Sequence, residues 1–182
     1  MNIEKFTELL FDECNYNPDV ERYYKFLRNS HMSEFRKTYF IQRLKYIYEQ
    51  VIALSKQSRR LDIKIWDCGC GYGTTCLFFA MNGFNVDGTT IGEHYISGIQ
   101  KRKEFWSKYG NSDLFNVRYE LLPDSHPDPS SYDAILIQDT LHHMEPLQEI
   151  ISILNKVLKP EGKLIITEPN GNNLFHRVRH FL

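Results

Sequence analysis

The hydrophobic pattern of the chain changes near Leu61, and this change predicts two parts. Before Leu61, apolar residues recur at the three- and four-residue spacing of amphipathic helices. After it, short apolar runs alternate with helical patterns, which is typical of a parallel sheet with crossover helices. We therefore expect residues 1–60 to form a helical cap or lid and residues 61–182 to form an α/β domain.

The first part reads as three helices, over residues 3–11, from Asn17 onward, and over residues 33–54. Along the third, six apolar residues lie roughly on one face: Phe35, Tyr39, Leu44, Ile47, Val51 and Leu54. Of the aromatic residues of the chain (12 Phe, 11 Tyr and 2 Trp), a large share lies in these helices. Two interpretations stay open, a helical layer packed on the sheet or a lid whose aromatics line a substrate pocket.

The second part contains five strand candidates and three intervening helices. The strands are expected over residues 63–68, 85–90, 117–122, 134–138 and 163–167, and the helices over 74–81, 93–108 and 146–158. Pro146 suits the first turn of the last helix, and the segment Lys159-Pro160-Glu161-Gly162 ends it. The order of elements predicts a parallel sheet of about five strands.

Composition and charge limit the classes of function. The chain has 182 residues and a net charge of −1, so it offers no basic excess for nucleic acid or for an anionic membrane. No run approaches the ~18 apolar residues of a membrane span, and the N-terminus lacks a signal-peptide core. The four cysteines form no C-x-x-C pair, which argues against structural zinc and favours reduced thiols in a cytoplasmic protein.

The segment with the most chemical information is a glycine-rich turn after the first predicted strand. Asp67 ends that strand, and Gly69, Gly71 and Gly73 follow at alternate positions before a helix begins. Glycines let the backbone approach a ligand closely, and a helix start offers free N–H groups. A nicotinamide or flavin dinucleotide site would instead have the spacing G-x-G-x-x-G, but residue 74 is Thr.

Four motifs in order resemble class I S-adenosylmethionine-dependent methyltransferases. IWDCGCGYG is similar to the first motif of that family, and FNVDGTTIGEHYISGIQKR to its second strand and helix. SSYDAILIQDTLHHM resembles the fourth strand and its loop, and ILNKVLKPEGKLIITEP the helix, turn and fifth strand. The resemblance implies a doubly wound, Rossmann-like sheet with S-adenosyl-L-methionine as cofactor and S-adenosyl-L-homocysteine as product.

The family usually has seven strands, of which the last two form an antiparallel edge. Here the sequence ends 15 residues after Thr167, and residues 170–182 leave no room for two strands. We expect a truncated fragment or an unusually short member that lacks these antiparallel strands. The fifth strand would then be an exposed edge, through which the chain could form a homo-oligomer.

The resemblance also assigns residues to the methionine half of the cofactor. It implies that this half is surrounded by Asp67, Gly69, Cys70, Gly71 and Gly73. The carboxylate of Asp67 is expected to hold the cofactor's ammonium, directly or through water. Its alternative role is to cap the amides of the turn itself.

The ribose and adenine contacts follow from the second and third strands. Most family members end the second strand with an acid, whereas the alignment here places Thr90 there, as in the cyclopropane synthase branch. Asp87 is an alternative, but strand alternation makes it face as Thr89 does. Ile91 is expected against adenine, and the adenine amino group is expected to meet Glu120 or Asp124.

The reacting methyl group is expected near the loop after the fourth strand. Gln138 and His143 are predicted cofactor contacts, and His142 is the candidate general base. Adjacent histidines point in different directions and no third ligand is evident, so we expect no metal.

The resemblance implies transfer of a methyl group by in-line displacement. The neutral charge and the aromatic N-terminal helices favour a small, partly apolar acceptor. The alternative is a catalytically degenerate or truncated subunit that binds the cofactor and acts through a partner chain.

Overall fold

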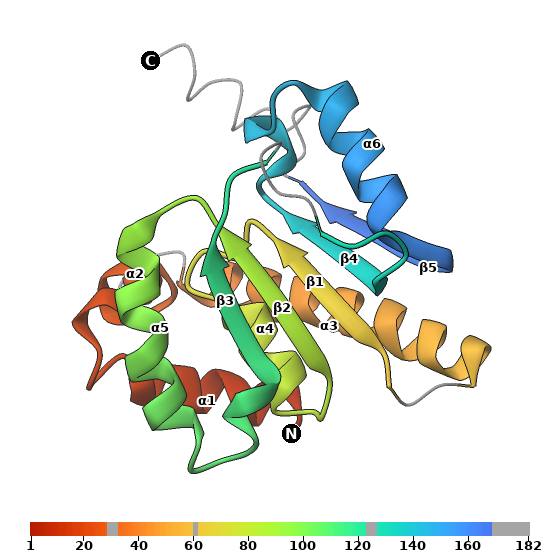
Figure 1. Ribbon diagram of the computed structural model, residues 1–182. Coiled ribbons are helices and arrows are strands. Elements are labelled where there is room, and N and C mark those ends of the chain that lie inside the picture. The colour runs from red at the N-terminus through yellow and green to blue at the C-terminus, as the bar shows by residue number, and fades with distance from the viewer. Residues whose placement is uncertain (29–32, 60–61, 123–126, 169–182) are drawn as a thin grey trace.

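The computed structural model describes residues 1–28, 33–59, 62–122 and 127–168 (Figure 1). Its centre is a parallel five-stranded sheet in the order β3-β2-β1-β4-β5, which confirms the predicted α/β class and the sheet. The strands are β1 (Lys64–Cys68), β2 (Asn85–Thr90), β3 (Phe115–Tyr119), β4 (Tyr132–Gln138) and β5 (Leu158–Thr167). The helices are α1 (Ile3–Glu13), α2 (Pro18–Arg28), α3 (Ser33–Ser58), α4 (Thr74–Ala80), α5 (Glu93–Trp106) and α6 (Leu147–Val157), with single turns η1 (Ser112–Leu114) and η2 (Leu141–His143).

The strand order makes the sheet doubly wound. The chain runs outward from the central β1 to β3 and then returns to the other side of β1 with β4. In such sheets ligands bind outside the carboxyl ends of the strands, where the order reverses. A ligand site is therefore expected at the carboxyl ends of β1 and β4.

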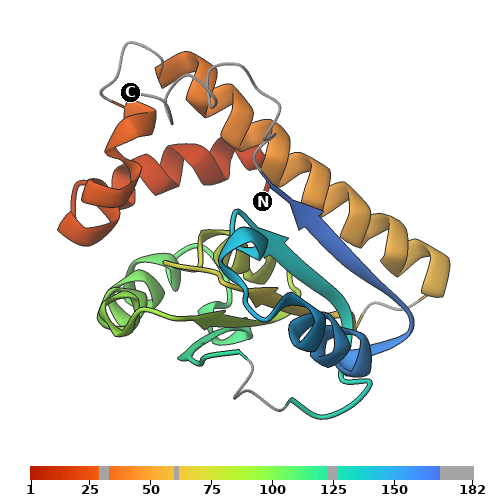
Figure 2. The ribbon, with the colours of Figure 1, turned by 90° about the horizontal axis from the view of Figure 1, so that it is seen from above.

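The strands bury alternate side chains on opposite faces of the sheet. Ile65 and Leu136 belong to the core shared with α1 to α5, whereas Trp66 and Ile137 pack with α6 on the other face. Figure 2 shows α3 and α6 on opposite sides of the sheet. Successive side chains of a strand point to opposite faces, and here both faces are covered. The strands therefore have a nearly continuous apolar sequence.

Several strand boundaries differ from those predicted, and the largest differences are in β3 and β5. β3 spans Phe115–Tyr119 rather than residues 117–122, and Phe115 is fully buried in the core. β5 begins at Leu158, which pairs with Tyr132 before the register shifts and pairing resumes at Lys163. Glu161, between these two paired positions, has a φ of 65°. The segment Lys159-Pro160-Glu161-Gly162, which was predicted to end the helix, is therefore an irregular first part of β5.

The N-terminal helices both pack on the core and cover the sheet. Leu44, Ile47 and Val51 of α3 are buried, as the predicted face requires. Phe35 and Tyr39 are 66% and 48% exposed, so the predicted buried face of this helix is wrong for the first turns of α3. These turns face a cavity rather than the sheet.

β5 forms one edge of the described sheet, and α3 packs beside it (Figure 2). Pairing of this edge with a second chain stays a prediction. Residues 170–182, on which the expectation about the antiparallel strands rests, lie outside the described residues. In the described part of the chain, no helix combines the length and apolar character needed to cross a membrane.

Candidate active site

A cavity of about 880 Å³ lies between the carboxyl ends of the strands and the N-terminal helices. Gly69, Cys70 and Gly71 of the glycine turn contribute to one wall, and α2 and α3 contribute to another. Small-molecule sites typically measure ~300–1,000 Å³, so this cavity is near the upper end of that range. It has room for more than one small molecule.

The glycine turn is held in a conformation that other residues rarely adopt. Gly69, Gly71 and Gly73 have φ angles of 88°, 53° and 69°, respectively. The amides of Gly69 and Cys70 both donate to the carbonyl of Thr89 at the end of β2, over 3.0 and 2.8 Å. These bonds fix the turn against the sheet.

The three glycines have different surroundings. A Cβ on Gly71 would meet only the hydroxyl of Tyr23 at 4.0 Å, so this position is open toward the cavity. A Cβ on Gly73 would lie 2.6 Å from the ring of Phe115. Gly73 therefore allows close packing of the turn on β3, and it does not line the cavity.

Asp67 is buried beneath the turn, and its side chain is 1% exposed. Its Oδ2 accepts a hydrogen bond from Cys76 Sγ at 3.5 Å, and Gln138 Nε2 lies 3.3 Å from Oδ1. Burial raises the pKa of Asp67 to about 6, although these hydrogen bonds oppose the rise. Gln138 lines the cavity and Asp67 does not, so Gln138 lies between the Asp67 carboxylate and the cavity.

The end of β2 contributes a second wall. Thr90 is buried and lines the cavity, together with Ile91, which is 65% exposed. Thr89 also lines it, but its hydroxyl accepts a hydrogen bond from Trp66 Nε1 at 3.1 Å. The hydroxyl of Thr90 and the apolar surface of Ile91 are thus adjacent groups on this wall.

Asp87, the alternative ribose ligand, has partners elsewhere. Its Oδ2 accepts a hydrogen bond from the hydroxyl of Tyr132 at 2.7 Å and lies 3.2 Å from Nζ of Lys64. It is not among the residues that line the cavity. The geometry therefore favours Thr90 over Asp87 as a ligand contact.

The end of β3 supplies an acid to the same cavity. Glu120 lines it, its amide donates to the carbonyl of Thr90 at 3.1 Å, and its carboxylate pairs with Arg118. Asp124, the other candidate for the adenine amino group, lies outside the described residues.

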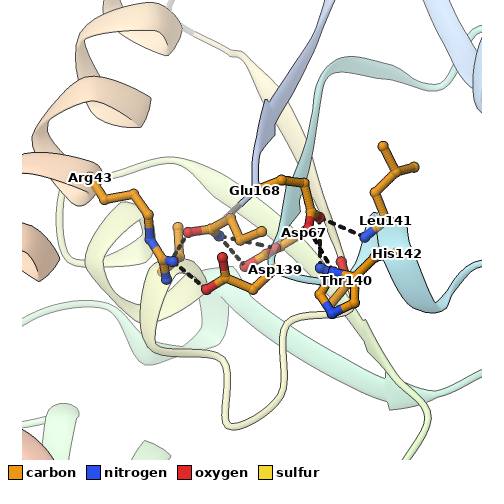
Figure 3. Close-up of polar contacts among 9 residues, drawn as sticks. Arg43, Asp67, Asp139, Thr140, Leu141, His142 and Glu168 are labelled. Atoms are coloured by element: carbon orange, nitrogen blue, oxygen red, sulfur yellow. Dashed lines mark hydrogen bonds and ion pairs between the residues drawn. The ribbon is translucent and has the colours of Figure 1, made fainter. Parts of the chain in front are cut away.

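The loop after β4 carries the two predicted histidines. His143 lines the cavity, whereas His142 is half exposed and lies outside its lining. Nδ1 of His142 is 2.7 Å from Oε2 of Glu168, and Oε1 of Glu168 accepts from the amides of Thr140 and Leu141 (Figure 3). Glu168 therefore shapes the loop that holds both histidines.

The same loop is tied to the N-terminal helices. Asp139, at φ 53°, forms an ion pair with Arg43 of α3, and both residues line the cavity. Tyr23, Tyr39 and Phe40 line it as well. Sequence reasoning did not single out Tyr23, Phe40 or Arg43 as site residues, although the aromatics in residues 1–60 left open a lid that lines a substrate pocket.

The cysteines and acids in the described part of the chain show no metal-binding arrangement. All four cysteines are free thiols, and burial raises the pKa of Cys68 to about 12, so this thiol stays neutral. Among the described residues, no group of three His, Cys, Asp or Glu side chains is arranged to hold a metal ion.

Comparison with known proteins identifies the family. A family described as "Methyltransferase domain" matches residues 66–164, which include the glycine turn, β2 to β4 and α6. The chain belongs to this methyltransferase domain family. This confirms the resemblance to class I S-adenosylmethionine-dependent methyltransferases.

Curated relatives and solved structures agree with this membership. The chain is 29% identical over 129 residues to the ubiquinone biosynthesis O-methyltransferase of Rickettsia bellii, covering 70% of this chain and 50% of the relative. It is 31% identical over 132 residues to the Rickettsia akari protein of the same name, covering 70% and 48%. The chain therefore spans about half the length of the curated relatives it matches.

Two solved structures share the fold. A protein from Pyrococcus horikoshii superposes with a TM-score of 0.62 and 22% identity, over 87% of this chain and 66% of the other. A SAM-dependent methyltransferase from Methanosarcina mazei superposes with a TM-score of 0.54 and 24% identity, over 66% and 59%. The cofactor of the family to which the chain belongs is S-adenosyl-L-methionine.

The residues of the cavity fit this cofactor. Gly71 leaves open space on the cavity side of the turn, where a ligand backbone can approach. A buried carboxyl with a raised pKa lies behind the turn, where a cationic ammonium would favour its ionised form. The hydroxyl of Thr90, the apolar surface of Ile91 and the carboxylate of Glu120 follow along the ends of β2 and β3.

Proposed function

We propose that this protein transfers the methyl group of S-adenosyl-L-methionine to a small, partly apolar acceptor. The observation that carries the proposal is that one cavity is lined both by the glycine turn and by aromatic side chains of α2 and α3. A cofactor on the turn and an acceptor under the aromatic helices would therefore share one enclosed space.

The cofactor is proposed to extend from the turn across the end of β2 toward β3. Gly69, Cys70 and Gly71 would contact its methionine half. Gln138 would face the ammonium group of the cofactor, and the Asp67 carboxylate would lie behind Gln138. The hydroxyl of Thr90 would bind the ribose in place of the usual acid. Ile91 would pack on adenine and Glu120 would accept from its amino group, with Asp124 as the alternative from the sequence.

The acceptor is proposed to lie beneath the N-terminal helices. Tyr23, Tyr39 and Phe40 contribute aromatic surface there, and Met144 and Ile150 contribute apolar surface near the loop after β4. Aromatic and aliphatic walls favour a ring or a short hydrocarbon on the acceptor. The name of the Rickettsia relatives, which specifies O-methyl transfer, supports a hydroxyl as the methylated group.

Methyl transfer from this cofactor requires the protein mainly to position the two reactants and to exclude water. The cofactor supplies an activated methyl group on a sulfonium, which an acceptor nucleophile displaces in line. The helices α2 and α3 would shield the nucleophile from water and hold it near the methyl carbon. A hydroxyl acceptor also needs a base, and His143 in the cavity wall is better placed for this than His142.

Two measurements test the proposal. Isothermal titration of the folded protein with S-adenosyl-L-methionine is expected to show micromolar binding, and lack of binding at millimolar concentration would refute it. Formation of S-adenosyl-L-homocysteine is then measured with small aromatic alcohols, aliphatic acids, amines and peptides. Turnover with peptides alone would contradict a small acceptor. Binding without turnover would support the alternative of a cofactor-binding subunit that acts through a partner.

A further inference from the structure

A buried ion pair joins the first helix to α5 beside the glycine turn. Nε and Nη2 of Arg102 each donate to one oxygen of Glu13 at 2.8 Å, and Nε1 of Trp106 donates to the same carboxylate at 2.8 Å. The side chains of Arg102 and Glu13 are 0% and 1% exposed. Both charges are thus removed from water and bonded to each other.

The remaining nitrogen of Arg102 reaches the glycine turn itself. Nη1 donates to the carbonyl of Tyr72 at 2.6 Å and to the hydroxyl of Thr74 at 2.8 Å. The hydroxyl of Tyr24 in α2 bonds to the same Thr74 hydroxyl. Arg102 therefore connects α1 and α5 to the turn, and the Thr74 hydroxyl connects the turn to α2.

A second contact between α5 and the turn supports this connection. A Cβ on Gly98 of α5 would lie 3.0 Å from the ring of Tyr72, so the absence of a side chain there admits the ring. Tyr95 of α5 and Tyr23 of α2 contact the same ring edge-on, with centroids 4.6 and 5.2 Å away. The turn is thus held through both the backbone carbonyl and the side chain of Tyr72.

Stability alone does not explain this arrangement. A buried ion pair is often no more stabilising than apolar side chains of the same volume, because both ions lose their hydration. What arginine adds is a rigid planar fork that can bind a carboxylate and a carbonyl at the same time. We propose that Arg102 is a positioning residue, which fixes residues 72–74 so that Gly71 faces the cavity and couples the turn to α2.

This proposal rests on the proposed function for its effect on the cofactor, and Arg102→Lys tests it. A single ammonium can pair with Glu13 but cannot also hold both Tyr72 and Thr74. We expect the dissociation constant for S-adenosyl-L-methionine to rise at least tenfold by calorimetry. We also expect the Gly73 amide, which donates to Cys70, to exchange its hydrogen faster in the ligand-free protein.

Trp106→Phe is the matched control, because it removes a bond to Glu13 in the same network without touching the turn. It is expected to lower the melting temperature while leaving affinity within twofold of the wild type. A folded Arg102→Lys variant with wild-type affinity and wild-type exchange at Gly73 would overturn the proposal. If wild type itself binds no cofactor, the proposed function fails, but exchange at Gly73 still tests positioning.

Tyr24→Phe provides a second test if Arg102→Lys does not fold. It keeps the ring of Tyr24 and removes the hydroxyl that bonds α2 to Thr74. Faster exchange at Gly73 is expected, with the amide of Gly83, a turn glycine that donates to Ala80, unchanged as an internal reference. Unchanged exchange at Gly73 would refute the coupling of α2 to the turn.

Discussion

Arg43 of α3 forms an ion pair with Asp139, which directly follows β4 (Figure 3). The two residues are 96 positions apart in sequence and line the same cavity. The pair therefore joins the N-terminal helices to the loop beside the candidate cofactor site. It makes the proposed lid part of the site and gives a direct way to test the lid.

Arg43→Met is expected to lower kcat/KM about tenfold, because the lid loses its connection to the loop after β4. Its effect on the free energy of unfolding should be only ~1 kcal/mol, since both side chains are partly exposed and solvent weakens the pair. Steady-state assays and urea unfolding measure the two effects.

Lys45→Met is the control on the same helix, because the pair of Lys45 with Glu49 is largely exposed and neither residue lines the cavity. It should change neither quantity measurably. If Arg43→Met and Asp139→Asn have independent, additive effects in a double-mutant cycle, the ion pair does not couple the lid to the loop.

The pKa of Asp67 predicts an unusual dependence of stability on pH. Native Asp67 keeps its proton up to about pH 6, whereas the unfolded chain releases it near the ordinary value of 3.8. Between these values the unfolded chain binds fewer protons, so the free energy of unfolding falls as pH rises from about 4 to about 6. The Asp67 contribution to this fall is at most about 3 kcal/mol.

Urea unfolding of ligand-free protein from pH 4 to pH 7 measures this effect, with Asp67→Asn as the reference that lacks the titrating group. Equal pH profiles for the two proteins would show that burial does not raise the pKa. Affinity for S-adenosyl-L-methionine should increase through pH 6 in wild type only, because the cofactor ammonium favours the ionised carboxylate.

Gly71→Val is expected to reduce cofactor affinity at least a hundredfold, because it places a branched side chain in the open space of the cavity. Gly83→Val is its control. Gly83 also has a positive φ, of 85°, and a Cβ there would meet no atom within 4 Å, so it reports the backbone penalty alone. Calorimetry that shows equal affinities for the two folded variants would refute the role of the turn.

Thr90→Val should weaken cofactor binding by about 1 kcal/mol, the scale of a neutral hydrogen bond, with little change in folding because the shape is kept. Asp87→Asn should instead lower stability, since Tyr132 and Lys64 lose a charged partner, and leave affinity nearly unchanged. Calorimetry and thermal unfolding of both variants separate the two effects. A larger affinity loss for Asp87→Asn would reverse the assignment of the ribose contact.

Much of the fold could be predicted from local patterns. The short apolar runs of β1 and β4, which alternate with helical patterns, predicted strands of a parallel sheet. The start of β3 could not be predicted, because its boundary depends on Phe115 packing against the turn at Gly73. The exposed first turns of α3 had the same apolar spacing as its buried half.

The site could be predicted only along short stretches of sequence. The spacing of Gly69, Gly71 and Gly73 after Asp67 indicated the turn, because the conformation of a short turn depends mainly on the residues within it. That Gly71 faces the cavity while Gly73 packs on Phe115 depends on a strand that comes much later in the chain. Periodicity cannot show such a difference.

The sequence by itself determined the family, the order of strands and helices and the position of the glycine turn, because these are encoded in residues close to one another. Only the tertiary structure decided which side chains share the cavity. It paired Arg43 with Asp139, placed His143 rather than His142 in the wall, and connected Glu13 to the turn through Arg102. These contacts join segments that are distant in sequence, and they exist only once the sheet and the N-terminal helices have packed together.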